Sequence, residues 1–266
     1  MDDLLVIARY NENIDWLKKL NKNYIIYNKG NDNISSGHGT VKNIPNIGYE
    51  EYCYINFLID FYDKLPNRIF FIQANSLEHS PDLLKLLDLQ HLYSDIQPLS
   101  FFYNERVPGN LITNLTNCLW LDGNKIHVNF YNSLIQRYFL PLDSFDYYPP
   151  EGLGLYSLFR EFYNNQNDVR QCMSDHLKIQ LRKFNDKDMT PMCYGGIFSV
   201  TKELILKYPK TYYQYLLEKN IEAVKFHPKM FGWIMELIWL ELFGYNPPEE
   251  LYTPKLNSFL TWWKNV

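Results

Sequence analysis

The chain has 266 residues, of which 46% are hydrophobic and 17% aromatic. This length and composition suit one α/β domain with a full core, and they exclude intrinsic disorder as the main state, because disordered chains lack apolar and aromatic residues. The formal net charge of −4 argues against a protein that binds duplex DNA, which needs a basic excess to neutralise phosphates.

Targeting and redox features of the sequence favour a cytoplasmic protein. No run of about 18 consecutive apolar residues is present, so no membrane span is expected. The N-terminus, Met1-Asp2-Asp3, lacks the basic region of a secretory signal. The four cysteines are widely spaced, which is typical of reduced thiols in a cytosol-like compartment.

Three continuous apolar runs in the N-terminal half predict strands that are buried on both faces, as in a parallel sheet. They cover residues 4–8, 24–27 and 69–72, and the third predicted strand begins one residue earlier, at Arg68. Helical patterns separate them at residues 11–20 and 48–62, so the first strand, helix and second strand form a βαβ unit. Residues 28–46 are rich in Asn, Gly and Ser and predict a long loop, a kind of segment that often carries function. A short helix is expected over residues 80–89.

The C-terminal half continues the alternation of strands and helices. A strand pair at 119–121 and 126–128 is joined by an Asp-Gly turn, and residues 143–154 form a linker or lid. The remaining predicted elements are helices at 155–164 and 169–184, a glycine-led strand at 194–200, a helical run at 201–219 broken by Pro209, and an apolar helix at 230–243 that Gly244 ends. The pattern predicts a single α/β domain with a mainly parallel central sheet flanked by helices.

Ligands of open α/β sheets bind at the carboxyl ends of the strands. Three polar segments follow the predicted strands there, at residues 9–12, 28–30 and 73–79. If the strands are neighbours, Arg9 and Lys29 bring positive charge beside helix N-termini, which suits a diphosphate. The alternative is that Arg9 pairs with Glu12 and that Lys29 is simply solvated.

Generic catalytic motifs are absent: the sequence has no P-loop, no G-x-G-x-x-G after the first strand, no H-E-x-x-H and no G-x-S-x-G. Gly37-His38-Gly39 is more typical of a flexible turn than of a site. Cys172 and His176 stand four apart on a predicted helix and could hold a metal. Without a second pair nearby, a core cysteine and a surface histidine are the favoured interpretation.

The apolar helix at 230–243 contains one informative carboxylate. Glu236 lies among residues that are expected to be buried on most faces, where an unpaired charge is costly. It is therefore either a paired structural anchor or a site residue with a raised pKa that suits general-base work. Glu241, near the helix end, is expected to be more exposed.

Several ordered blocks of the sequence resemble a glycosyltransferase-like family found in fungi, bacteria and large DNA viruses. The blocks lie at residues 7–12 with 15–17, 27–30, 46–50, 59–65, 70–73 with 78–80, 194–200, and 236–239 with 243–244. The resemblance spans almost the whole chain and is weaker from about residue 90 to about residue 190. If the protein comes from a virus, its expected location is the cytoplasm of the host cell.

The resemblance implies a GT-A-type glycosyltransferase with a single α/β/α domain. Such an enzyme moves a sugar from a nucleoside diphosphate to a glycan or glycoprotein acceptor. Residues 1–130 would form the nucleotide-binding half, and residues 131–266 the acceptor-side half. Glu236 would be the base that deprotonates the acceptor hydroxyl. The residues that the resemblance implies for nucleotide-sugar binding are Arg9, Asn11, Glu12, Asn28, Lys29, Gln73, Asn75, His79, Gly195 and Gly196.

One departure from the GT-A pattern concerns the metal. Many GT-A enzymes hold Mn²⁺ or Mg²⁺ through an Asp-x-Asp motif at a strand end. This chain has the uncharged Gln73-Ala74-Asn75 there, with Glu78 and His79 as further candidate ligands. Asp122-Gly123-Asn124 is the other candidate, although a hairpin turn is favoured for it. Without a metal, Arg9, Lys29 and Arg106 would have to stabilise the leaving group.

Two other functions remain open at this point. The first is a non-catalytic carbohydrate- or nucleotide-binding protein on a GT-A scaffold that has lost the metal motif. The second is a phosphate-ester hydrolase, which is disfavoured because the sequence lacks the clustered Asp and His residues of a two-metal site.

Overall fold

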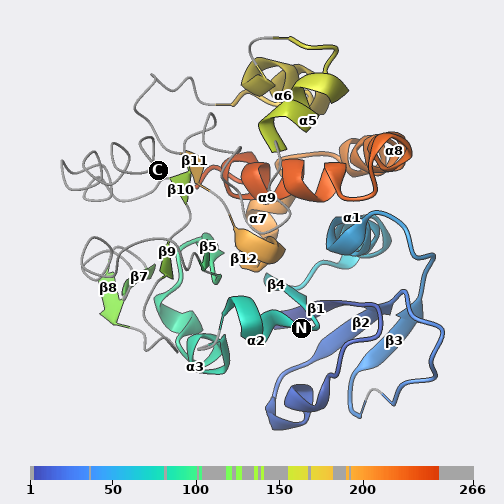
Figure 1. Cartoon of the computed structure of the whole chain (residues 1–266). Helices are drawn as coiled ribbons and strands as arrows, with labels where there is room; N and C mark the ends of the chain where they lie inside the picture. The colour runs from blue at the N-terminus through green and yellow to red at the C-terminus, as the bar shows by residue number, and fades with distance from the viewer. Residues whose placement is uncertain are drawn as a thin grey trace.

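The computed structural model describes residues 3–35, 37–80, 83–100, 155–166, 169–181, 190–191 and 193–245, together with short strands between residues 102 and 140. Its centre is a six-stranded sheet with the order β3-β2-β1-β4-β12-β5 (Figure 1). These strands are β1 (Asp3–Arg9), β2 (Tyr24–Asn28), β3 (Thr40–Asn43), β4 (Arg68–Gln73), β5 (Ile96–Pro98) and β12 (Phe198–Thr201).

The sheet is mixed. β1 pairs in parallel with β2 and β4, and β2 pairs in parallel with β3. β12 runs antiparallel to both of its neighbours, β4 and β5. The α/β class and the flanking helices predicted from the sequence are therefore confirmed, with a sheet of mixed strand direction.

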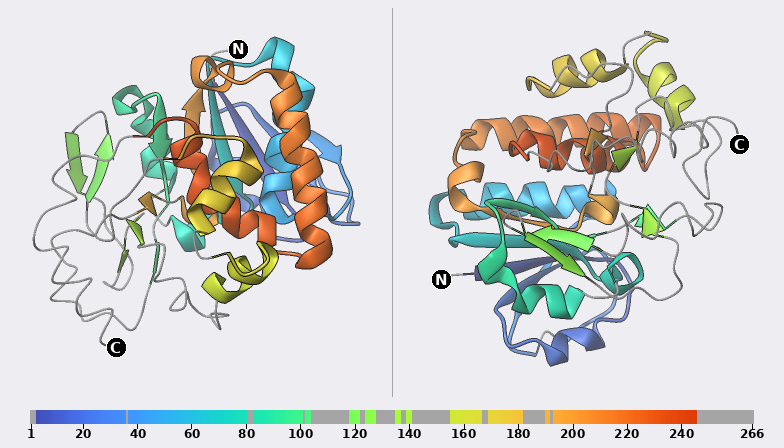
Figure 2. Two further views of the ribbon diagram at one scale, coloured as in Figure 1. Left: turned by 90° about the horizontal axis from the view of Figure 1, so that it is seen from above. Right: turned by 90° about the vertical axis from the view of Figure 1, so that its left-hand side faces the viewer.

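Helices cover both faces of the sheet. α1 (Tyr49–Phe61) and α9 (Met230–Leu242) lie against one face, and α8 (Lys210–Phe226) packs on both of these helices (Figures 1 and 2). α5 (Leu155–Phe162) and α6 (Val169–Leu177) form the outermost layer on that side. The short helices η1 (Asp15–Lys19) and α3 (Leu83–Asp88) lie on the other side.

The remaining elements are short. They are η2 (Tyr62–Lys64), α2 (Ser76–His79), η3 (Gln90–Leu92), η5 (Tyr194–Gly196), α7 (Lys202–Ile205) and the strands β6 (Phe102–Tyr103), β7 (Cys118–Leu121), β8 (Asn124–His127), β9 (Ile135–Gln136), β10 (Phe139–Leu140) and β11 (Thr190–Pro191). β7 and β8 pair antiparallel, which confirms the predicted strand pair. The turn between them, the predicted lid at 143–154 and Arg106 lie outside the described residues.

Burial between layers explains the apolar runs. Residues 4–8 of β1 are buried because helices cover both faces of the sheet. On α9, Trp239 packs on Phe71 of β4 and Phe198 of β12, with ring centroids 6.4 Å and 5.6 Å away. α9 is apolar nearly all round because it lies between the sheet and the outer helices.

Several local predictions need correction. The segment 28–46 is not all loop, because its residues 40–43 form β3, a polar edge strand. The glycine-led strand begins only at Phe198, since Gly195 and Gly196 have positive φ angles of 64° and 62° and form a turn. The helix predicted at 11–20 is the shorter η1. The helix predicted at 169–184 ends at Leu177, before Lys178 with its φ of 54°.

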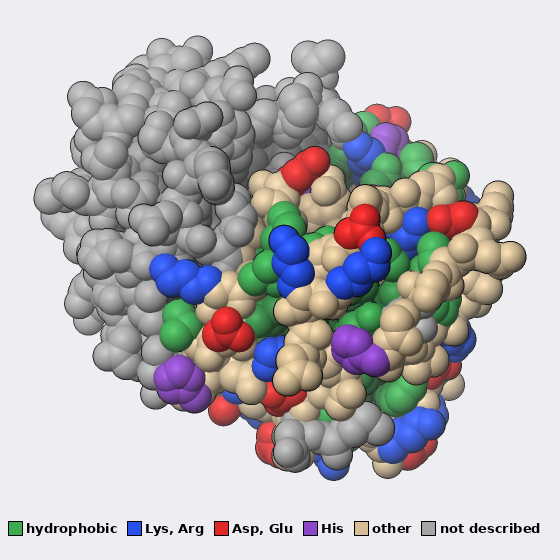
Figure 3. All heavy atoms as spheres, turned by 90° about the horizontal axis from the view of Figure 1, so that it is seen from below, with side chains coloured by type: hydrophobic (Ala, Val, Ile, Leu, Met, Phe, Trp, Pro, Cys, Tyr) green, Lys and Arg blue, Asp and Glu red, His purple; other side chains and the backbone are tan. Residues whose placement is uncertain are grey.

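Surface charge on the described part of the chain is mixed. On the face shown in Figure 3, Lys and Arg side chains are interspersed with Asp and Glu side chains. Among the described helices, none combines the length and apolar content needed to cross a lipid bilayer.

Candidate functional site

The carboxyl ends of β1, β2 and β4 meet at one edge of the sheet. Arg9 of β1 stands opposite Asn28 of β2, and Ala8 stands opposite Gln73 of β4. The pairing continues past the strands, because the Lys29 N–H donates to the Arg9 carbonyl and the Ala74 N–H to the Ala8 carbonyl, each at 2.8 Å. The three polar segments predicted to converge therefore lie side by side.

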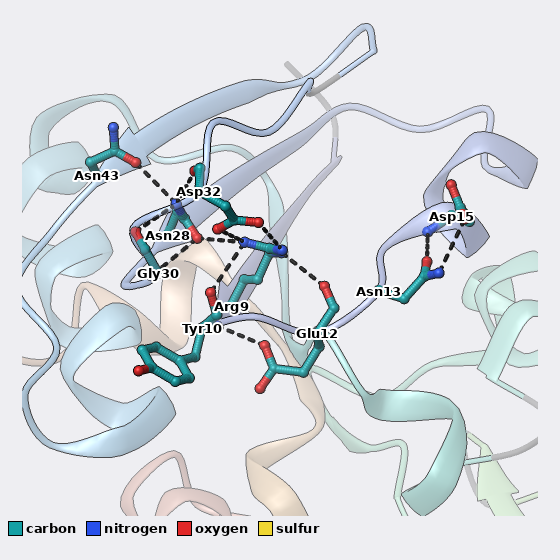
Figure 4. Close-up of polar contacts among 9 residues, drawn as sticks. All are labelled: Arg9, Tyr10, Glu12, Asn13, Asp15, Asn28, Gly30, Asp32 and Asn43. Atoms are coloured by element: carbon teal, nitrogen blue, oxygen red, sulfur yellow. Dashed lines mark hydrogen bonds and ion pairs between the residues drawn. The ribbon is translucent and has the colours of Figure 1, made fainter.

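Arg9 is the centre of a buried polar network at this edge (Figure 4). Its side chain is only 5% exposed, and its guanidinium donates to both oxygens of Asp32, at 2.8 Å and 2.7 Å. It also donates to Asn28 Oδ1 at 2.8 Å and to the Glu12 carbonyl at 2.9 Å. The hydrogen bond from Arg9 holds the pKa of the Asp32 carboxyl below its usual value. Arg9 thus positions the loops after β1 and β2, and most of its donors are engaged inside the protein.

Lys29 is buried, so the alternative that it is merely solvated is wrong. Its side chain is 8% exposed, and its ammonium donates to the Tyr49 carbonyl at 2.5 Å. Lys29 also lines an open pocket of about 450 Å³ at the ends of β2 and β3. The rest of this pocket is lined by Gly30, Asn31, Asp32, Asn33, Asn43, Ile44, Pro45 and Asn46. The long loop that the sequence singled out therefore forms most of a polar pocket.

Two glutamates in the first turn of α1 lie next to Lys29, and the sequence analysis did not identify them. Glu50 accepts a hydrogen bond from Gln73 Nε2 at 2.6 Å, which ties α1 to the end of β4. Glu51 is fully buried, and neither of its carboxylate oxygens has a hydrogen-bond partner among the described residues. Burial raises the pKa of both carboxyls, and the charges of Glu50 and Glu236 raise that of Glu51 further.

The position of Glu51 could have been inferred from helical periodicity. Glu51 shares one helical face with Tyr54, Ile55 and Leu58, at spacings of three, four and seven residues. All four side chains are fully buried. A carboxylate on such a face is the signal that the sequence analysis used for Glu236 and missed here.

Glu236 lies on the inner part of α9, and its backbone holds the glycine turn in place. The Cys193 N–H donates to the Glu236 carbonyl at 3.1 Å. This contact places η5 beside β4, where a Cβ atom on Gly195 would come within 2.9 Å of Gln73 Nε2 and of His79 Cδ2. The Glu236 side chain is half-buried, and its charge acts on Glu51 and on Cys193. Residues far apart in the chain therefore gather around the end of β4.

The other predicted site residues lie around this centre. Glu12 Oε2 accepts a hydrogen bond from the Tyr10 N–H at 2.7 Å, and the Glu12 charge acts on Glu50. His79 is half-buried, and burial lowers its pKa. Asn11 and Asn75 are exposed at the loop tips after β1 and β4. Polar groups from β1, β2, β4, α1, η5 and α9 thus share one region.

Two predictions about charged or metal-binding residues outside this region are corrected. Glu241 is not exposed: its side chain is 5% exposed and pairs with Arg170, because α6 packs against α9 there. His176 is not a surface histidine, since its ring packs on Phe162 at 5.5 Å and burial lowers its pKa. Within the part of the chain that the structure describes, no group of three or more His, Cys, Asp or Glu residues is arranged to hold a metal ion.

Replacing Glu51 by glutamine should flatten the pH dependence of stability. Because burial raises the pKa of Glu51 in the folded state, folding takes up a proton once the pH exceeds the unfolded pKa of about 4.3. The wild type therefore loses stability as the pH rises toward the folded pKa, and a residue that cannot titrate removes this loss. Melting temperatures between about pH 4 and about pH 9 measure it. Glu218→Gln, at an exposed position of α8, is the control. If the melting temperatures of the wild type and of Glu51→Gln change with pH in the same way, Glu51 is ionised in the folded protein and the prediction is wrong.

The fold and the site define an α/β protein with a mixed sheet, whose strand ends carry a polar pocket, a buried lysine and a group of carboxylates. Residues 5–257 match the family described as "Protein of unknown function (DUF3431)", and the chain belongs to this family. No curated protein matches the sequence.

Proposed function

We propose that this protein is a glycosyltransferase of the GT-A type that transfers a sugar from a nucleoside diphosphate to a glycan or glycoprotein acceptor. The observation that carries the proposal is the position of Lys29. This residue lines the pocket at the ends of β2 and β3, and its charge acts on Glu50 and Glu51 beside Gln73. Lys29 thus lies between two regions. One is a pocket for the nucleoside, and the other is a group of carboxylates for the reacting sugar.

The pocket has the chemistry that a nucleoside needs. Its volume of about 450 Å³ falls in the range of small-molecule sites. The asparagines of its lining offer amide donors and acceptors for a base, and the Asp32 carboxylate can accept hydrogen bonds from ribose hydroxyls. Arg9 fixes Asp32 for this task. The Lys29 ammonium at the inner end can bind the diphosphate.

Glu236 would act as the general base on the acceptor side. Its carboxylate takes the proton of the acceptor hydroxyl while the oxygen attacks C1 of the donor sugar. The bond between C1 and the diphosphate oxygen breaks, and the diphosphate leaves with its negative charge stabilised by Lys29. Gly195 and Gly196, which carry no side chain, let the donor sugar approach the backbone of η5.

The residues at the end of β4 do not fit a hard divalent cation well. Mn²⁺ and Mg²⁺ prefer carboxylate oxygens, whereas Gln73, Asn75 and His79 offer amides and an imidazole. Glu78, the carboxylate among the candidate ligands here, is exposed on α2. Gln73 is also hydrogen-bonded to Glu50. We therefore assign the stabilisation of the leaving group to Lys29 and route no step through a metal.

Titration calorimetry with UDP, GDP and dTDP, with and without Mn²⁺, tests the nucleotide site. We expect one of them to bind, and Lys29→Met to weaken that binding at least about tenfold, which corresponds to about 1.4 kcal/mol. Lys18→Met is the matched control, because Lys18 is an exposed lysine that pairs with Asp15. If none of the three nucleotides binds under either condition, the proposal is wrong.

The uncharged end of β4 supports a second candidate, a protein that binds the nucleotide or a carbohydrate without catalysis. Gln73 and Asn75 stand where a catalytic Asp-x-Asp motif would carry two carboxylates. The two functions differ in one result. A binding protein would hold the nucleotide sugar intact in the presence of acceptors, whereas a transferase would release the nucleoside diphosphate.

A further inference from the structure

One face of α9 at the site is partly exposed to solvent. From Met230 to Leu240 every residue is buried except Trp233 and Glu236, which are half-buried. Lys229, just before the helix, is half-buried as well. The spacing of these three residues, i, i+4 and i+7, puts them on one helical face. An ammonium, an indole ring and a carboxylate therefore follow one another along α9.

Tyr49 of α1 lies next to this face. The ammonium of Lys229 is 5.7 Å from the centroid of the Tyr49 ring and 6.0 Å from that of the Trp233 ring. A Cβ atom on Gly232 would lie 3.7 Å from Tyr49 Cβ, so Tyr49 sits against α9. The rings of His227 and Trp233 are stacked, with centroids 5.0 Å apart. Two aromatic rings thus flank one lysine, and one of them, Trp233, is about one helical turn from Glu236.

The backbone at Tyr49 is unfavourable for a bulky residue. Its φ is 45°, directly after Gly48 with a φ of 52°. Left-handed backbone is costly for side chains other than glycine, asparagine and aspartate. Lys29 holds the Tyr49 carbonyl in this conformation. Strain of this kind persists where the surrounding structure enforces it, and it clusters at ligand sites. Tyr49 in this conformation is 41% exposed.

We propose that Tyr49 and Trp233 form a platform on which a pyranose ring of the acceptor stacks, with its reacting hydroxyl at Glu236. The C–H face of a sugar is apolar and packs on aromatic rings, while its hydroxyls need polar partners at the edge. Glu236 and Lys229 supply these partners. The inference rests on the proposed function, since it names the acceptor class of the same site and the residues that bind it.

An array of neutral and acidic oligosaccharides, probed with the whole protein, tests the platform. We expect the wild type to bind at least one saccharide class, and both Trp233→Ala and Tyr49→Asn to lower that binding at least tenfold. Tyr49→Phe should retain it, because the ring is kept. Phe226→Ala is the matched control: Phe226 is also 41% exposed, but its ring packs on Phe162 of α5. A wild type that binds no saccharide, or variants that bind as well as the wild type, would overturn the platform.

Folding and nucleotide binding are measured on the same samples. Asparagine tolerates left-handed backbone, so Tyr49→Asn should melt at or above the temperature of the wild type. The affinity of Trp233→Ala for the nucleotide should stay within about twofold, because Trp233 does not line the pocket at the ends of β2 and β3. A wild type that binds nucleotide but no saccharide overturns the platform alone. A wild type that binds saccharide at Tyr49 and Trp233 but no nucleotide supports the platform and overturns the proposed transferase.

Discussion

Replacing Glu236 by glutamine should lower the rate of sugar transfer by about 100-fold or more, with nucleotide affinity unchanged. Glutamine keeps the size of the side chain and its capacity to accept a hydrogen bond, but it cannot take the proton of the acceptor hydroxyl. The backbone carbonyl of residue 236, which receives the Cys193 N–H, stays in place. A lower rate in this variant would therefore result from the missing general base and not from a disrupted turn at η5.

The measurement is the initial rate of nucleoside diphosphate release with the nucleotide sugar that calorimetry identifies, in the presence of acceptor. Glu218→Gln, an exposed carboxylate on α8, should leave the rate unchanged. If Glu236→Gln transfers sugar at the wild-type rate, Glu236 is the structural anchor that the sequence left open, and the base must be sought elsewhere.

Replacing Arg9 by methionine should destabilise the protein by about 1–3 kcal/mol, the usual cost of leaving buried hydrogen-bond acceptors without a donor. Arg9 is almost fully buried, and its donors satisfy Asn28, Asp32 and the Glu12 carbonyl. Without the guanidinium, buried acceptors of two loops are left unpaired. Urea unfolding at neutral pH measures the loss, and Lys18→Met, which removes an exposed lysine, should cost much less.

The same variant should lose part of the acid sensitivity of the fold. The hydrogen bond from Arg9 lowers the pKa of Asp32 in the folded state. The stability that this contact provides is present above the unfolded pKa of about 3.9 and is lost as the pH falls through the lowered folded pKa. Arg9→Met should therefore show a shallower loss of stability at acid pH. A loss of less than about 1 kcal/mol at neutral pH would show that Arg9 is not the organising residue of this edge.

The central strands could be predicted because their signal is local. The strands predicted at 4–8, 24–27 and 68–72 are almost entirely apolar, and helices cover both faces of these strands in the structure. β3 was missed because Thr40–Asn43 is a short polar edge strand without an apolar run. The antiparallel direction of β12 depends on how the chain returns to the sheet, which no local pattern records.

The candidate site was predictable only in its location. The rule that ligands bind at strand ends brought Arg9, Asn28 and Gln73 together correctly. Their partners depend on the folded chain: Arg9 meets Asp32 across a loop, and Glu241 meets Arg170 from another helix. Sequence spacing cannot supply such contacts. The Tyr49 platform likewise depends on two helices that meet at Gly232.

A crystal structure of the protein with a nucleoside diphosphate sugar tests the central claim most directly. We expect the nucleoside in the pocket lined by Asp32 and Asn43, the diphosphate at Lys29, and the sugar between η5 and Glu236. A nucleotide bound at any other surface, or a sugar directed away from Glu236, would contradict it.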